Sequence, residues 1–223
     1  MLELVFIIMV IGILAVLIAP KSNDKVALHD AAKQVLKDIR YTQHLALVDD
    51  MLDTNDAQWY KERWQIAFFK DVAGSGSCGS YSGIWSYTIY SDRNHDAKPQ
   101  ADEMARNPLH RDKVLSGGVG SLCVDNKNNT GTYATTSMAL EKKYGINDIA
   151  FSGGCSGSTL LSFDHVGRVF KSVSQARAYD SDALLATDCN ITLCMGSCSA
   201  AASDEKLTIT ITPETGYARI VKN

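Results

Sequence analysis

The segment from Asp92 to Glu103 carries oxygen-bearing side chains at the spacing of a calcium-binding loop. Its first, third, fifth and twelfth positions are Asp92, Asn94, Asp96 and Glu103. In such a loop, side chains at alternate positions converge on one ion, and the final glutamate completes the oxygen shell. The sequence therefore predicts calcium as a bound metal at these four residues, and it predicts no other cofactor.

Two features of this segment differ from the calcium-loop pattern. Ala97 stands at the sixth position, where a glycine normally allows the sharp turn. Neither flank has the period of a helix, although calcium loops of this type usually lie between two helices. The alternative interpretation is an acidic turn that connects two strands without binding a metal.

Six cysteines lie beyond the apolar N-terminus. An even number in an exported domain indicates disulfide bonds, whereas the same residues in a reducing compartment would indicate a metal site. The last three are separated by four and by three residues, which is not the Cys-x2-Cys spacing of a zinc site. We expect three disulfides, with the connectivity left open, among Cys78, Cys123, Cys155, Cys189, Cys194 and Cys198.

Nothing in the sequence supports an enzyme. We find no nucleophile elbow, phosphate-binding loop, dinucleotide fingerprint or His-Glu-x-x-His motif. The net charge is −3, from 22 basic and 25 acidic residues, so no overall field attracts nucleic acid. The histidines show no spacing typical of metal ligands, and we assign them surface or packing roles: His29, His44, His95, His110 and His165.

The elements that must position these residues begin with an apolar segment, residues 4–19, which Glu3 precedes. A carboxylate that enters a bilayer costs about 3 kcal/mol unless it is paired. We therefore expect Glu3 to pair with a positive group of a neighbouring copy. A secretory signal peptide is an alternative, but no Lys or Arg precedes Lys21. An ordinary membrane anchor is another alternative, and it leaves Glu3 unexplained.

After Pro20 the apolar residues recur at steps of three and four, which predicts an amphipathic helix to about Met51. From Trp64 onward, aromatic and β-branched residues alternate with polar ones, as in half-buried antiparallel strands. A helix followed by strands indicates an α+β architecture. The predicted strands lie at residues 64–69, 84–90, 162–164, 168–173 and 207–212.

The N-terminus resembles that of type IV pilins and type II secretion pseudopilins. The matching residues are Leu2, Glu3, Leu4, the run Gly12-Ile13-Leu14-Ala15, and Pro20. The leader and the residues that normally precede Met1 are absent from the sequence. The segment 30–47 and the two glycine-turn hairpins at 162–170 and 207–221 resemble the GspH/FimT group of this superfamily.

This resemblance implies an α+β fold in which a long N-terminal helical spine packs on an antiparallel β-sheet domain. The spine would comprise a hydrophobic half, residues 1–20, which forms the transmembrane and filament-core helix, and an amphipathic half, residues 21–52. Residues 53–223 would form a periplasmic or extracellular domain. The implied function is that of a minor pilin or pseudopilin of a type IV pilus or type II secretion system.

Assembly would depend on Glu3, Gly12 and Pro20. The implied partners are other pilin or pseudopilin subunits, an inner-membrane assembly platform and, for the precursor, the prepilin peptidase. The implied location is the bacterial inner membrane, with a single span, and afterwards a periplasmic or cell-surface filament. The sequence does not separate a pseudopilin from a minor or major pilin, nor a tip position from a shaft position.

Two alternatives from other functional classes stay open. One is a membrane-anchored periplasmic binding or sensor domain that never polymerises. The other is a minor pilin that captures DNA, because some GspH/FimT relatives carry a Gly-Arg-x-Arg pattern in the last hairpin. Here Gly216 and Arg219 match that pattern, Tyr217 replaces the first arginine, and Lys222 adds a second cation. So few cations make a poor phosphate-binding track, and we expect nucleic-acid binding to be absent.

Overall fold

The structure is a computed structural model that describes residues 24–49, 51–70, 83–118, 133–173 and 177–221. One long helix and two four-stranded antiparallel sheets form most of this part of the chain. Several residues singled out in the sequence lie outside the described residues: Glu3, Gly12, Pro20, Cys78, Cys123 and Lys222.

The long helix, α2 (Asp24–Val48), has 25 residues. Its buried positions recur every three or four residues, which places them on one face of the helix. Most apolar side chains that recur every three or four residues in the sequence lie on this face. Ala31 and Asp38 are buried there as well, whereas Leu36 is only partly buried. The buried residues are Leu28, Ala31, Ala32, Val35, Asp38, Ile39, Thr42 and Ala46.

The first sheet has the strand order β2-β1-β6-β7, and all its neighbours are antiparallel. Its strands are β1 (Trp64–Lys70), β2 (Trp85–Ser91), β6 (Leu160–Phe163) and β7 (Val169–Phe170). Strand β1 is central, and its aromatic and β-branched residues suit a buried strand.

The second sheet has the order β10-β9-β8-β5, and it is also antiparallel throughout. Its strands are β5 (Asp148–Gly153), β8 (Cys189–Cys194), β9 (Lys206–Ile211) and β10 (Ala218–Val221). The remaining elements are short. They are the parallel pair β3 (Lys113–Val114) and β4 (Tyr133–Ala134), the helix α3 (Leu140–Tyr144), and the 3-10 turns η1 (Trp59–Glu62), η3 (Thr136–Met138) and η4 (Ser203–Glu205).

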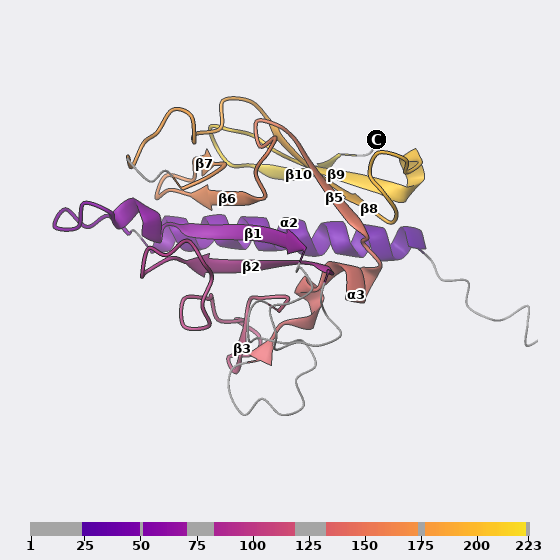
Figure 1. The fold of residues 1–223 in the computed structure, drawn as a ribbon, viewed down its shortest axis with the longest axis horizontal. Coiled ribbons are helices and arrows are strands. Elements are labelled where there is room, and N and C mark those ends of the chain that lie inside the picture. Colours follow the sequence, from indigo (N-terminus) through magenta and orange to yellow (C-terminus); the bar gives the residue numbers. More distant parts are fainter. Residues whose placement is uncertain (1–23, 50, 71–82, 119–132, 174–176, 222–223) are drawn as a thin grey trace, which may run out of the picture.

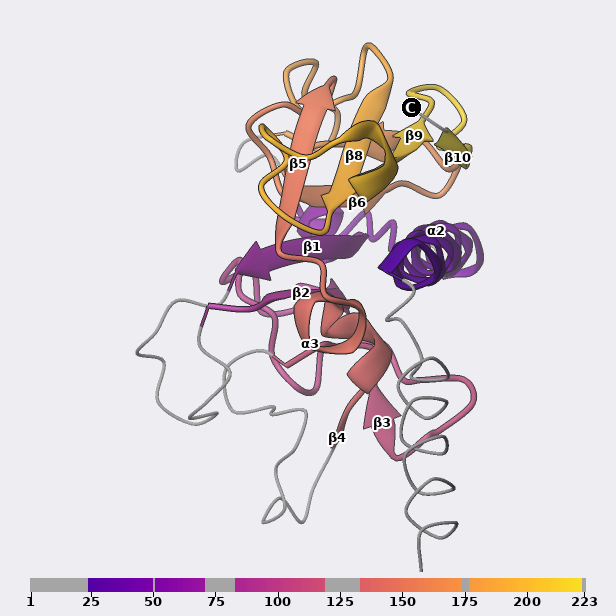
Figure 2. The same ribbon diagram turned by 90° about the vertical axis from the view of Figure 1, so that its right-hand side faces the viewer.

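Helix α2 contacts strands of both sheets, namely β1 and β6 of the first and β8, β9 and β10 of the second. Figures 1 and 2 show the second sheet on one side of the helix, and β2 and α3 on the opposite side. The main hydrophobic core joins side chains of the helix to side chains of both sheets, with Ile39, Ile66 and Ile209 among those with no exposed surface. The helix therefore takes part in the core that connects the two sheets.

The predicted fold, a long helical spine packed on one antiparallel sheet, is wrong. The helix of the structure has 25 residues, which corresponds to about 38 Å, and the strands divide into two sheets. The sequence could not show this division, because alternation reveals that a strand is half-buried without revealing which strand it pairs with. In the structure Ile66 of β1 lies opposite Leu161 of β6, far away in the sequence.

None of the helices in the described part of the chain has the length and apolar composition that a membrane crossing requires. The predicted membrane segment, residues 1–20, lies outside the described residues.

Both predicted hairpins are present. Strands β6 and β7 form the first, with Ser162 opposite Phe170, and β9 and β10 form the second, with Ile211 opposite Ala218. The two turns contain Gly167 (φ 86°) and Gly216 (φ 62°), both in the left-handed region that glycine adopts without strain.

Candidate functional site

The Asp92–Glu103 loop lies between two segments that pair as strands do. It begins directly after Ser91, the last residue of β2, and the Ser91 amide donates to the Glu103 carbonyl at 3.0 Å. One residue further out, Tyr90 forms an isolated bridge with Met104. The paired backbone therefore closes the loop, which explains why no helical period flanks it in the sequence.

Ala97 adopts the backbone conformation that glycine normally supplies at this position of a calcium loop. Its φ is 60°, and its amide donates to Asp92 Oδ2 at 3.0 Å. The Asp96 amide donates to the other oxygen, Oδ1, at 3.1 Å. A left-handed alanine costs about 1–2 kcal/mol, and these bonds within the loop help to offset that cost. The departure from glycine at Ala97 therefore does not prevent the turn.

Three carboxylates of the loop converge. Asp92, Asp96 and Glu103 each offer one oxygen, and these oxygens all lie within 4.8 Å of one another. Calcium–oxygen distances are about 2.3–2.6 Å, so ligands on opposite sides of one ion lie about 5 Å apart. The three oxygens thus fit around a single calcium ion. Asn94 belongs to the same turn, where its side-chain oxygen accepts from the Asp96 amide at 3.0 Å.

Two of these carboxylates are buried, since Asp92 and Glu103 are each only 4% exposed. Glu103 accepts from the backbone amides of Asn94 (3.1 Å) and Gln100 (3.2 Å). These amides compensate part of the charge, but like charges held together in a low-dielectric region still attract a cation. The residues present therefore fit a hard divalent cation, and calcium binding stays a prediction.

The negative charge of this site affects the neighbouring residue Tyr90. Burial raises the pKa of its hydroxyl well above the ordinary value, and the charges of Asp92, Glu103 and Asp96 raise it further. Tyr90 stays neutral as a result. It is 2% exposed and packs in a small hydrophobic cluster with Met104 and Val114, which supports the base of the loop.

A second group of possible metal ligands, which the sequence did not predict, lies beside this loop. His95 Nε2 is 3.2 Å from Glu62 Oε1 and 4.0 Å from Asp56 Oδ2. The sequence favours an ordinary surface or packing role for His95, because no second ligand lies near it at a regular spacing. Glu62 is 33 residues away, so only the packing of η1 against the loop brings the two together.

Four of the six cysteines lie in the described residues, and they form two disulfides, Cys155–Cys189 and Cys194–Cys198. The prediction of disulfides is confirmed for these four. The first bond ties the segment after β5 to the first residue of β8. The second closes a short loop at the end of β8.

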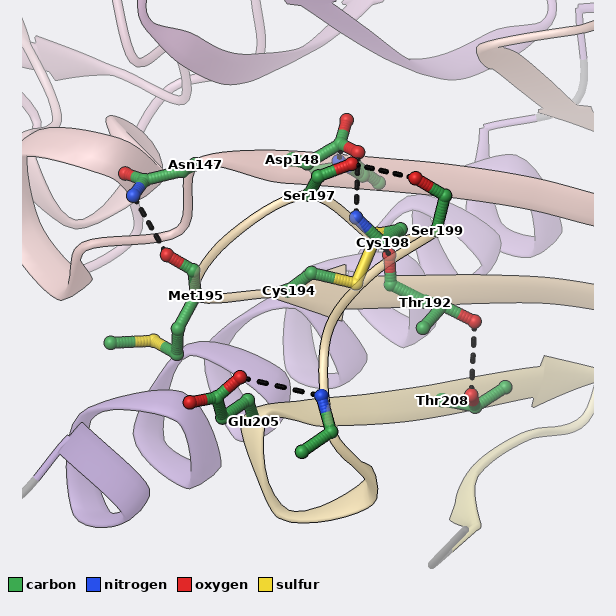
Figure 3. The surroundings of a disulfide bond; sticks show 12 residues. Asn147, Asp148, Thr192, Cys194, Met195, Ser197, Cys198, Ser199, Glu205 and Thr208 are labelled. Carbon is green, nitrogen blue, oxygen red and sulfur yellow. Dashed lines mark hydrogen bonds between the residues drawn. A yellow bond between two sulfur atoms is a disulfide. The ribbon is translucent and has the colours of Figure 1, made fainter.

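Figure 3 shows how the Cys194–Cys198 loop is held on the second sheet. Asp148, the first residue of β5, accepts from the Cys198 amide at 2.9 Å, and the Asn147 side chain donates to the Met195 carbonyl at 2.7 Å. These contacts come from β5, the strand adjacent to β8, and from the residue that precedes it. The disulfide and the two hydrogen bonds together fix the direction in which the chain leaves the sheet.

Two of the residues considered for DNA binding, Tyr217 and Arg219, lie just before and within β10, the edge strand of the second sheet. Arg219 is exposed, and Tyr217 is 55% exposed. However, the Arg40 guanidinium lies 5.7 Å from the centre of the Tyr217 ring, and Arg40 donates to the Ala218 carbonyl at 2.7 Å. One face of the ring is therefore already covered by a protein cation, which reduces its use for stacking on a base.

A cavity of about 530 Å³ lies between α2 and the segments around residues 107–115 and 135–137. Asp38 lines it and is 2% exposed; its Oδ2 accepts from the Tyr87 hydroxyl at 2.6 Å and from Gln34 at 2.8 Å. Burial raises the pKa of Asp38, although the hydrogen bond from Tyr87 opposes that shift. Asp38 could not be recognised from the sequence, because a lone acid in an amphipathic helix gives no signal of burial.

No known family model matches this chain, and neither the curated proteins nor the solved structures contain a match to it.

Proposed function

We propose that this chain is a filament subunit, a minor pilin or pseudopilin of a type IV pilus or a type II secretion system, which assembles through its N-terminal segment. The observation that carries the proposal is the order of residues at the N-terminus. Glu3, the Gly12–Ala15 run and Pro20 stand at the offsets of that superfamily. Several matches at one fixed spacing are far less frequent by chance than any single match.

The folded part supports this proposal in two ways. First, two disulfides are typical of a domain that folds in an oxidising compartment, such as the periplasm. Second, the end at which α2 begins lies toward one end of the longest axis of the ribbon (Figure 1). The apolar N-terminal segment is therefore attached at an end of the folded part.

In this proposal Glu3 pairs with the N-terminal amine of an adjacent subunit inside an apolar environment. Both charges are then compensated where water cannot solvate them. Removing one partner of a buried ion pair costs about 3–5 kcal/mol, which corresponds to more than a hundredfold change in an equilibrium. Substitution of Glu3 should thus abolish incorporation while leaving the folded domain unchanged.

The experiment compares Glu3→Leu and Glu3→Ala with the wild-type chain in the producing cell. Sheared filaments and membranes are separated, and the subunit in each fraction is measured by immunoblot. We expect both variants in the membrane fraction at wild-type amounts. In the filament fraction, the amount of each variant should be less than about one hundredth of the wild-type amount. Glu214→Leu, which removes an exposed carboxylate from the last hairpin, is the matched control. Normal incorporation of Glu3→Leu would refute the proposal.

A second candidate is a membrane-anchored binding or sensor domain that stays monomeric. The observation that favours it is the cavity beside Asp38, whose volume of about 530 Å³ lies in the range of small-molecule sites. A chain of this kind would tolerate Glu3→Leu and would never appear in a filament fraction. The same fractionation experiment therefore separates the two candidates.

A further inference from the structure

Three ligand-type side chains from two distant segments meet at one point of the surface. Asp56 and Glu62 come from the η1 region, which precedes β1, and His95 comes from the loop that follows β2. One oxygen of each carboxylate and one imidazole nitrogen lie within 4.8 Å of one another. We call these three residues the triad.

The distances within the triad suit a small divalent ion. His95 Nε2 is 3.2 Å from Glu62 Oε1 and 4.0 Å from Asp56 Oδ2. Two ligands of a tetrahedral zinc ion, each about 2.1 Å from the metal, lie about 3.4 Å apart. The two measured separations bracket this value. The carboxylate oxygens of Asp56 and Glu62 also lie within 4.8 Å of each other.

The neighbouring contacts orient the Asp56 side chain and hold the backbone at Glu62. The Gln58 amide donates to Asp56 Oδ1 at 2.7 Å, which leaves Oδ2 directed at the histidine. The Ser91 hydroxyl donates to the backbone carbonyl of Glu62 at 2.6 Å, which fixes the end of η1 against the end of β2. Such contacts around the ligands reduce the reorganisation that metal binding requires.

The donor types distinguish the triad from the adjacent Asp92–Glu103 loop. An imidazole nitrogen is a poor ligand for calcium, which takes oxygen ligands almost exclusively, but it is a preferred ligand for zinc. The side chains of His95, Asp56 and Glu62 are 21%, 38% and 29% exposed, so an ion can reach them from solvent. Three protein ligands leave a fourth position for water.

We propose that Asp56, Glu62 and His95 bind one zinc ion, with water as the fourth ligand. A bound ion would connect η1 to the Asp92–Glu103 loop, because each segment supplies at least one ligand. This proposal does not depend on the filament function.

The test uses the full chain, purified in detergent and freed of metal, with calcium present in excess so that the Asp92–Glu103 loop is not available to zinc. Zinc is titrated in by calorimetry, and in a parallel sample cobalt(II) is added as a spectroscopic probe. We expect one equivalent of zinc to bind and cobalt to give visible absorption bands of a low-coordinate site.

Two variants remove one ligand each. His95→Asn suits the backbone φ of 62°, because asparagine tolerates the left-handed conformation, and Glu62→Gln keeps the shape of the side chain. Each should weaken zinc binding at least about tenfold and abolish the cobalt bands. His44→Gln, which removes an exposed imidazole from α2, should bind zinc as the wild type does. Thermal unfolding followed by circular dichroism verifies that each variant is folded.

The proposal is overturned if the wild type binds no zinc, or if His95→Asn binds it as tightly as the wild type. A third variant, Asp96→Asn, tests whether zinc enters the neighbouring loop instead. Loss of zinc binding in Asp96→Asn, together with its retention in Glu62→Gln, would assign the ion to that loop and refute the triad.

Discussion

The side-chain amide of Gln43, on α2, donates a hydrogen bond to the backbone carbonyl of Gly167 at 3.0 Å. The same nitrogen donates to the carbonyl of Thr215 at 2.7 Å. Gly167 lies in the β6–β7 turn of the first sheet, and Thr215 lies in the β9–β10 turn of the second. One helical residue therefore connects the turns of both sheets.

Replacing Gln43 by alanine should destabilise the fold. The change leaves two turn carbonyls without their donor, and a hydrogen bond lost in a partly buried position costs about 1–3 kcal/mol. The free energy of unfolding, measured by urea denaturation, should fall by about this amount. His44→Ala, next in the sequence but exposed, should change it by less than about 0.5 kcal/mol. Equal stability of the two variants would contradict the role assigned to Gln43.

Gly216→Ala should lower the free energy of unfolding more than Gly157→Ala does, although both glycines have a positive φ. A Cβ at Gly216 would lie 2.4 Å from Gln43 Nε2 and 2.5 Å from the Gly167 carbonyl oxygen. Gly157 has a φ of 79° with nothing within 4 Å of its Cβ position, so Gly157→Ala measures backbone strain alone, about 1–2 kcal/mol. We expect Gly216→Ala to exceed this cost in urea denaturation.

Part of the additional cost at Gly216 should disappear when Gln43 is alanine, because the nearest atom is then removed. A double-mutant cycle measures this coupling. Strict additivity of the two substitutions would show that Gln43 does not restrict the Gly216 turn.

Asp38 should make the folded state less stable as the pH rises. Burial raises its pKa in the folded protein above the ordinary 3.8, so the folded state holds the proton more tightly than the unfolded chain does. The stabilisation that Asp38 provides is complete below the pKa of this residue in the unfolded chain. It is lost as the pH rises through the higher pKa of Asp38 in the folded protein. Relative to Asp38→Asn, the wild type should therefore lose unfolding free energy as the pH rises from the ordinary pKa of 3.8 through the raised pKa of Asp38 in the folded protein. Parallel stability profiles for the two proteins would contradict this.

The two disulfides should differ in their contribution to stability. Cys155 and Cys189 are 34 residues apart, whereas Cys194 and Cys198 are four apart. Loop-closure entropy predicts about 4 kcal/mol for the first bond and about 2 kcal/mol for the second. Urea denaturation of the double variants Cys155→Ala/Cys189→Ala and Cys194→Ala/Cys198→Ala measures both. A larger loss from the second pair would show that local contacts, such as that from Asp148 to Cys198, outweigh chain entropy.

Calcium should stabilise the protein through the Asp92–Glu103 loop. At a free concentration one hundred times the dissociation constant, binding adds about 2.7 kcal/mol to the free energy of unfolding. The melting temperature should therefore rise by several degrees in calcium relative to a chelator, and Glu103→Gln should remove most of the rise. Asp102→Asn changes an exposed neighbouring acid outside the pattern and should respond to calcium as the wild type does. If calcium has no effect on the stability of the wild type, the Asp92–Glu103 segment is an acidic turn that binds no metal.

Some features of this protein follow from short stretches of sequence. The buried face of α2, the glycine-turn hairpins at Gly167 and Gly216, and the oxygen-bearing side chains from Asp92 to Glu103 all depend on residues close together in the chain. Their periodicity or spacing is visible without the fold. The disulfides were also predictable as a class, because an even number of cysteines without the spacing of a zinc site indicates disulfide bonds.

Other features were decided only by the tertiary structure. Which strands share a sheet, which cysteines pair, and how Gln43 reaches two turns depend on segments that are far apart in the chain. His95 and Glu62 meet because η1 packs against the end of β2, and Asp38 is buried because Tyr87 lies opposite it. Such contacts form only when whole elements pack together. The sequence by itself determined the local elements and the chemistry that each one carries, and packing determined which of them meet.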